Sequence, residues 1–132
     1  MRFIAIALLA LMVAGCRGQP IYNVTNHPIP SAAQAFPLPR IEALIIEAGQ
    51  SRGWKFDRRE AGHLIATETE PKYSATVDIY FDQKNFRIMH KSTIGLKERA
   101  DGTIHSHYNM WILNLERDIE VRLTNATLAP SS

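Results

Sequence analysis

The sequence contains little cysteine and little net charge. Cys16 is the only cysteine among 132 residues, so no disulfide can form within the chain, and a folded domain must hold by packing alone. Lysine and arginine number 15 against 13 aspartates and glutamates, a formal net charge of +2. Such a balance lacks the single-signed field that steers proteins to nucleic acid, which is therefore excluded as an expected partner.

The chain also lacks an apolar run long enough to cross a membrane. Eleven apolar residues at 3–13 follow the positive Arg2, and the small residues Ala14 and Gly15 come next. A membrane-spanning helix needs about 20 apolar residues. A charge, a short apolar run and small residues, in that order, are typical of a secretory signal. We expect residues 1–15 to be an export signal, which leaves 132 − 15 = 117 residues, enough for one domain.

The lone cysteine directly follows this segment. The stretch "VAGC" at 13–16 resembles the lipobox of bacterial lipoproteins. The resemblance implies that Cys16 carries diacylglycerol, that the chain is cut before it, and that its new amino group is acylated, which gives stable anchoring in a lipid bilayer. Arg17, where aspartate would favour inner-membrane retention, implies the periplasmic face of the outer membrane. The alternative is a plain signal followed by a free or buried cysteine.

Residues 16–38 are rich in proline, which disfavours helix and favours extended chain. This composition predicts a spacer between lipid and domain. Ile21, Tyr22, Val24 and Ile29 are larger and more apolar than a free linker requires, so part of the stretch is also expected to pack along the domain as an extended strap, with a free sheet edge as one place for it. The domain is expected at 39–124 and a tail at 125–132.

Periodicity predicts an α+β domain. Ile41, Leu44, Ile45 and Ala48 share one helical face, which predicts a helix of roughly 13 residues with Pro39 in its first turn and Gly53 just beyond its end. Four strands follow, at 54–59, 63–69, 73–81 and 86–92, and short connections make them an antiparallel meander. Residues 93–104 are expected to be a long mobile loop.

A second helix is expected after that loop. Its apolar stripe comprises Tyr108, Trp111, Ile112, Leu115 and Ile119, and Ser106 is the expected N-cap. An apolar sheet face and two apolar helix stripes must bury one another. The expected order is therefore α-β-β-β-β-α, with both helices packed on one face of a four-stranded sheet.

Three stretches of the domain resemble a group of small, uncharacterised proteobacterial envelope lipoproteins. They are "RGW" at 52–54, "ATVDIYF" at 75–81 and "IHSHYNMWILNLERDI" at 104–119. The resemblance carries no activity with it, so function must be argued from the residues.

The sheet face turned away from the helices is the main candidate for an interaction surface. Tyrosine, methionine and arginine are enriched at interfaces, although a half-solvated face is also ordinary in antiparallel sheets. The expected set, with one residue of the loop 93–104, is Thr76, Asp78, Tyr80, Arg87, Met89, Lys91 and Lys97.

Metal binding and catalysis have less support. His105 and His107 could share an ion in an extended segment, with His90 or Asp101 as a third ligand, but within a helix their rings would point about 200° apart. Ser92, His90 and Asp78 supply the residue types of an acyl-transfer triad, yet no G-x-S-x-G turn presents the serine. No carboxylates are expected to pair in a cleft. We expect no enzyme, no metal and no cofactor.

The leading expectation is therefore a membrane-anchored, periplasm-facing lipoprotein that acts as a non-enzymatic binding or accessory module. Its partners would be the lipid bilayer, through Cys16, and an envelope protein or polymer. The alternative is a protein that binds a small ligand or metal in a pocket near His90, His105 and His107.

Overall fold

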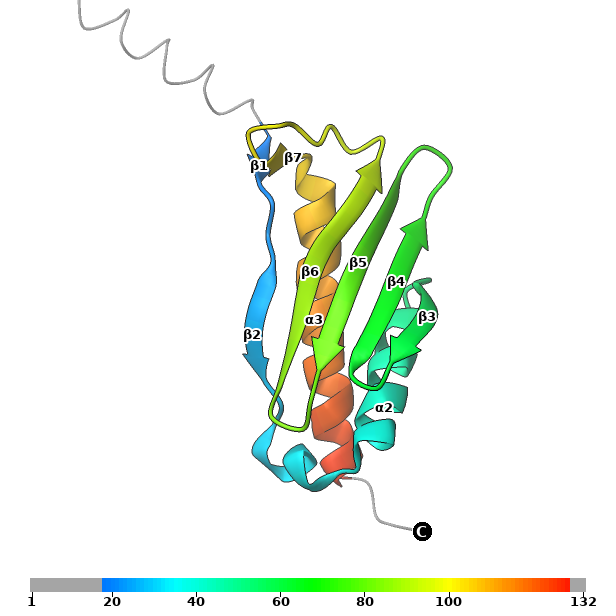
Figure 1. Cartoon of the computed structure of the whole chain (residues 1–132), viewed down its shortest axis with the longest axis vertical. Helices are drawn as coiled ribbons and strands as arrows, with labels where there is room; N and C mark the ends of the chain where they lie inside the picture. The colour runs from blue at the N-terminus through cyan, green and yellow to red at the C-terminus, as the bar shows by residue number, and fades with distance from the viewer. Residues whose placement is uncertain (1–17, 129–132) are drawn as a thin grey trace, which may run out of the picture.

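The computed structural model describes residues 18–128, which form two layers (Figure 1). One layer is a five-stranded antiparallel sheet in the order β2-β6-β5-β4-β3, and the other consists of the helices α2 and α3, both on one face of that sheet (Figure 1). A separate two-stranded sheet joins β1 to β7. The α+β class and the two helices on one face agree with the sequence prediction, whereas the expected count of four strands is wrong. The predicted signal at 1–15 and Cys16 lie outside the described residues.

The first helix, α2 (Leu38–Gln50), agrees closely with its prediction. It has 13 residues, Pro39 lies in its first turn, and Ile41, Ile45 and Ala48 are buried. Beyond its end Gly53 adopts a φ of 95°, a left-handed conformation that favours glycine. The amide of Trp54 then donates to the Gly49 carbonyl, 3.1 Å away, and the chain turns into the sheet.

The four predicted strands are all present. They are β3 (Lys55–Glu60), β4 (His63–Thr69), β5 (Ser74–Phe81) and β6 (Asn85–Ile94). Strand β5 alternates without exception between buried and half-buried residues. Strand β6 is longer than expected and contains a bulge, because Val77 pairs with His90 while Thr76 pairs with Ser92. Lys91 is the extra residue and has no partner on β5.

The segment expected to be a mobile loop, 93–104, is largely built into the fold. Strand β6 includes its first two residues, and β7 (Thr103–Ile104) its last two. Leu96 is 2 % exposed and Ile104 is completely buried. The amide of His105 donates to the Leu96 carbonyl, 2.8 Å away, which closes the segment on the start of the last helix.

The last helix, α3 (Ser106–Leu128), buries four of the five residues of the predicted stripe along the sheet, and the fifth, Trp111, is half-buried. Tyr108, Ile112, Leu115 and Ile119 are completely buried. The helix continues to Leu128, so the first four residues of the expected tail at 125–132 are helical. The expected N-cap is wrong, because Ser106 is already within the helix. The ring Nδ1 of His105 instead accepts a hydrogen bond from the His107 amide at 3.1 Å.

The fifth strand comes from the proline-rich segment. Strands β1 (Gln19–Pro20) and β2 (Val24–Pro28) and the 3-10 helix η1 (Ser31–Ala35) form an extended strap, residues 18–36. Strand β2 occupies the sheet edge beside β6, and β1 pairs with β7. Val24, Ile29 and Ala33 are buried in the core, at most 3 % exposed. Within the described residues, the strap is therefore part of the domain and not a free spacer.

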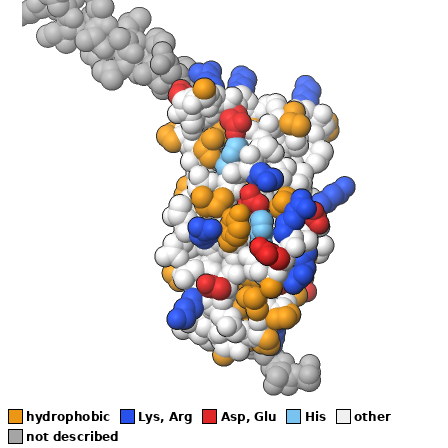
Figure 2. Space-filling model, viewed as in Figure 1, with side chains coloured by type: hydrophobic (Ala, Val, Ile, Leu, Met, Phe, Trp, Pro, Cys, Tyr) orange, Lys and Arg blue, Asp and Glu red, His pale blue; other side chains and the backbone are white. Residues whose placement is uncertain are grey.

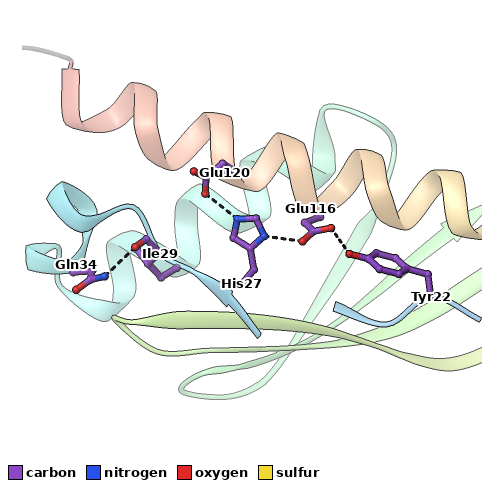
Figure 3. A network of polar contacts seen from close by, with 6 residues as sticks. All are labelled: Tyr22, His27, Ile29, Gln34, Glu116 and Glu120. Carbon is purple, nitrogen blue, oxygen red and sulfur yellow. Dashed lines mark hydrogen bonds and ion pairs between the residues drawn. The ribbon is translucent and has the colours of Figure 1, made fainter. Parts of the chain in front are cut away.

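Polar side chains of α3 hold the strap from the helix side (Figure 3). The Tyr22 hydroxyl donates to Glu116 at 2.7 Å, and the two ring nitrogens of His27 lie 2.7 Å from Glu116 and 3.0 Å from Glu120. One ring thus bridges the strap to two carboxylates on successive turns of α3. Burial and the hydrogen bond to Glu116 raise the pKa of Tyr22 to about 12, so its hydroxyl keeps the proton that it donates.

Asn109 holds the beginning of the strap. Its Oδ1 accepts from the Tyr22 amide at 2.9 Å, and its Nδ2 donates to the Pro20 carbonyl at 2.9 Å and to the Gln19 side chain at 3.3 Å. The side chain is 8 % exposed because the strap covers it. The hydrogen bonds formed by the Asn109 side chain thus join α3 to the strap.

One carboxyl group lies in the core layer. Glu68 of β4 follows Leu64 and Ala66 on the buried face and is only 8 % exposed. Burial, and next the neighbouring Glu70 carboxyl, raise the pKa of Glu68 to about 7. This carboxyl lies within the packed layer between sheet and helices, so its raised pKa does not mark a cleft.

Replacing Glu68 by glutamine should make stability less dependent on pH. Because its pKa is raised, Glu68 favours the folded state fully below about pH 4.5 and loses that contribution as the pH rises towards 7. Urea unfolding at pH 8 should show E68Q more stable than the parent by roughly 2 kcal/mol, with little difference at pH 4. The exposed Glu60→Gln is the control, and an equal gain at both pH values in E68Q would contradict the assignment.

Candidate functional site: the open sheet face

No helix covers the second face of the sheet in the described part of the chain (Figure 1). Figure 2, in the same view, shows hydrophobic, basic, acidic and histidine side chains intermingled on this face. Pairing across β4, β5 and β6 aligns its central residues in rows. We call the following set the open face: His63, Ile65, Thr67, Thr76, Asp78, Tyr80, Arg87 and Met89.

An imidazole and a carboxylate pair at the centre of the open face. Nε2 of His63 lies 2.8 Å from Oδ1 of Asp78, and the two side chains are only 18 % and 15 % exposed. Neighbouring residues shield the pair because Ile65 and Met89 sit opposite Asp78 on the two flanking strands. Shielding of this kind makes a polar pair on a sheet surface more rigid than an exposed one.

The Tyr80 ring is covered on both sides. His63 faces it from β4, with ring centroids 4.3 Å apart and planes at 17°, and the guanidinium of Arg87 lies 4.8 Å from its centroid on the β6 side. The row His63, Tyr80, Arg87 thus forms a continuous stack across three strands. Because both aromatic faces are occupied, the ring has no free face on which a sugar ring could stack.

Hydroxyls extend the open face on one side, and a shallow hollow borders it on the other. The Thr67 and Thr76 hydroxyl oxygens are 3.3 Å apart. An open hollow of about 350 Å³ lies where the β5–β6 turn meets the strap, and its walls include Asn26, Asn85 and Arg87. These groups supply hydrogen-bond donors and acceptors at the rim of an otherwise tightly packed patch.

The structure brings five of the seven predicted surface residues together: Thr76, Asp78, Tyr80, Arg87 and Met89. Lys91 is exposed but is the unpaired residue of the β6 bulge, and beyond that bulge Ser92 and Ile94 pair with the half-buried face of β5. Lys97 belongs to no strand of this sheet; it lies in the β6–β7 segment, where it is exposed and adopts a φ of 57°.

Sequence reasoning missed His63. The signal was present, because His63, Ile65 and Thr67 alternate with the buried Leu64 and Ala66. Once Ile65 is placed on the open face, His63 must share that face. Its pairing with Asp78 depends on the register of β4 against β5, which the pattern of a single strand does not give.

The histidines proposed for a ligand pocket have other contacts. The His90 ring packs edge-on against Tyr108 at 5.4 Å and forms an ion pair with Glu98. The rings of His105 and His107 are 4.4 Å apart, and the His105 ring accepts the His107 amide as a cap. Within residues 18–128, no group of three or more His, Cys, Asp or Glu side chains is arranged to hold a metal.

The three residue types of an acyl-transfer triad are not assembled. Asp78 pairs with His63 on the open face, whereas His90 faces the helix layer, and Ser92 lies beyond the bulge. In the described part of the chain, no hydroxyl is hydrogen-bonded to His63 that could act as a nucleophile. The geometry of the open face is suited to binding through fixed polar and aromatic groups.

Comparison with protein families, with curated proteins and with solved structures finds no match to this chain. Neither of the helices described at residues 18–128 combines the length and the apolar character needed to span a bilayer. The function must therefore be argued from the open face and from the sequence before the fold.

Proposed function

We propose that this protein is a lipid-anchored, non-enzymatic binding module of the bacterial envelope, held at the periplasmic face of the outer membrane, whose open face binds another envelope protein. The open face carries the proposal. A stack of His63, Tyr80 and Arg87 beside a shielded His63–Asp78 pair presents pre-ordered aromatic, cationic and anionic groups. Tyrosine and arginine held rigidly in this way are typical of residues that dominate protein interfaces.

The chemistry of the open face favours a protein over an envelope polymer. Polysaccharide sites commonly use an aromatic ring with a free face, and Tyr80 offers none because His63 and Arg87 cover both sides. The near-balance of charge over the whole chain gives no field that would attract a strongly anionic polymer. A protein partner can match both the apolar residues Ile65 and Met89 and the polar groups beside them.

The lipid anchor is supported by the sequence that precedes the fold. The order of Arg2, the apolar run at 3–13 and "VAGC" resembles a lipobox, and Arg17 after the cysteine favours the outer membrane over inner-membrane retention. Metal or small-ligand binding near His90 is less well supported, because the contacts of these histidines are within the fold.

Photo-crosslinking in bacterial cells tests both parts of the proposal. A benzophenone amino acid replaces Met89 on the open face or, as the matched control, Met110, which is 57 % exposed on α3. We expect one recurring envelope-protein adduct from position 89, its loss with Arg87→Glu, and none from position 110. The anchor is tested separately by a clickable palmitate analogue, which should label the parent but not Cys16→Ser.

The results of these experiments test the lipid anchor and the open face separately. Palmitate labelling without any adduct at position 89 would leave the anchor standing and remove the open face as a binding surface. An adduct of the same strength at positions 89 and 110 would show proximity in a crowded envelope and not specific binding. A parent protein that takes no palmitate would refute the anchor.

A further inference from the structure

The segments nearest to Cys16 in sequence lie at one end of the molecule. The strap begins there, because β1 pairs with β7 and the Ile21 amide donates to the Gly102 carbonyl at 2.9 Å. The β6–β7 segment, 95–102, and the β4–β5 turn, 70–73, meet at the same end, since Gly95 packs directly on the Lys72 carbonyl. We call this the anchor end; α3 leads away from it, and its last turn, which includes Leu128, is at the opposite end (Figure 1).

The anchor end exposes basic side chains beside an apolar one. Lys72, Lys97 and Arg99 are exposed, and Ile94 is 70 % exposed, among the most exposed large hydrophobic residues described. Figure 2 shows Lys and Arg side chains along this end. Cations around an isolated apolar side chain are the pattern by which proteins contact a membrane interface, since the cations reach phosphates while the apolar group leaves water.

The acidic groups at this end are partly engaged in the fold. Glu98 forms an ion pair with His90, and Asp101 accepts hydrogen bonds from the Thr103 amide at 3.0 Å and its hydroxyl at 2.6 Å. Glu70 is exposed beside Lys72. Three basic and three acidic side chains give this end a formal charge near zero: Lys72, Lys97 and Arg99 against Glu70, Glu98 and Asp101. The anchor end therefore does not attract a membrane over a long distance. It can bind phospholipid phosphates once a tether has brought them close.

The tether between Cys16 and the first described residue is very short. The first described residue, Gly18, is two residues after Cys16, and two residues span at most about 7 Å. This reach is below the Debye length of about 8 Å at physiological ionic strength, so headgroup charges act on the anchor end with little screening. Because the strap is fixed to β6, β7 and Asn109, the described chain provides no slack that would let the domain move away.

We propose that the anchor end rests on the phospholipid headgroups, with Ile94 entering the interface and Lys72, Lys97 and Arg99 on phosphates. The inference rests on the proposed lipid anchor and adds that the domain itself is a membrane-contacting body with one orientation. Strands β5 and β6 run lengthwise from this end, so the open face stands upright on the bilayer (Figure 1).

A single labelled cysteine at each end tests the orientation. Acylation occupies Cys16, the only native cysteine, so Ile94→Cys and the control Leu128→Cys can each carry one polarity-sensitive dye. Both parent side chains are exposed, at 70 % and 76 %, and α3, with 23 residues, separates their ends by about 34 Å. The lipidated variants are reconstituted into vesicles of phosphatidylethanolamine with a minority of phosphatidylglycerol.

On reconstitution, the dye at position 94 should shift its emission to shorter wavelength and be quenched by a headgroup spin label, while the dye at 128 should do neither. Adding Lys97→Glu and Arg99→Glu should reduce the quenching at 94. Equal behaviour of the two positions in protein that floats with the vesicles would overturn the docking and leave the anchor intact. Protein that takes no lipid and does not float would overturn both.

Discussion

Alanine at position 109 is expected to release the first residues of the strap while the remainder of the domain stays folded. Asn109 supplies the hydrogen bonds of the Tyr22 amide and the Pro20 carbonyl, and both distances are 2.9 Å. Removing one partner of a buried hydrogen bond costs about 1–3 kcal/mol for each group left unsatisfied. Two groups are affected at a two-residue strand that has few other contacts, so N109A should open β1 locally.

Hydrogen exchange followed by mass spectrometry measures this opening. Peptides that cover residues 18–23 should exchange much faster in N109A than in the parent, and peptides from β5 should remain protected. Asn114→Ala is the matched control, because Asn114 lies on the same helix and its side chain accepts only a long hydrogen bond from Arg117, at 3.5 Å. Unchanged protection at Tyr22 would mean that pairing with β7 and β6 and the contacts with Glu116 hold the strap without Asn109.

Alanine at position 95 is expected to destabilise the whole domain by about 3 kcal/mol, the sum of a backbone and a packing cost. Gly95 has a φ of 75°, which an L-residue with a side chain adopts at a cost. A Cβ there would also lie 2.2 Å from the Lys72 carbonyl oxygen. That atom belongs to the backbone of the β4–β5 turn, so the clash cannot be relieved by a side-chain rotation.

Gly102→Ala separates the two costs. Gly102 also has a positive φ, 84°, but a Cβ there would meet nothing within 4 Å. Gly102→Ala should lower the free energy of unfolding by only about 1 kcal/mol, which is the backbone cost alone. Urea unfolding of both variants gives the comparison, and equal losses would show that the close approach of Gly95 to the β4–β5 turn contributes nothing.

Local patterns predicted the elements that carry their own signal. The buried stripe of α3 and the strict alternation of β5 were both read from the sequence, because one face of each element is buried continuously against the other layer. The fifth strand carries no such signal. Strand β2 reads VTNHP, short and mostly polar, and it is held by β6 and by Glu116, which is 89 residues from His27.

The same contrast between regular and irregular elements explains which residues of the candidate site were predicted. Strand alternation placed Thr76, Asp78 and Tyr80 correctly because β5 is regular. The bulge in β6 inserts one residue, and a single insertion exchanges the two faces beyond it. Lys91 and the residues after it could not be placed from periodicity for that reason. Asn109 lay off the apolar stripe, and only the strap, a distant segment, explains why it is buried.

The pairing of the strap with the sheet also determines how partners would encounter this protein. If Cys16 carries the proposed lipid, a free chain at residues 16–38 would let the domain wander roughly 25 Å from that lipid and tumble in every direction. With β1 and β2 fixed, those excursions are removed. A partner embedded in the same leaflet would meet the open face by lateral diffusion in a thin layer, where confinement raises the effective concentration of both molecules. With the proposed anchor, this arrangement favours frequent encounters between the open face and its neighbours in the membrane.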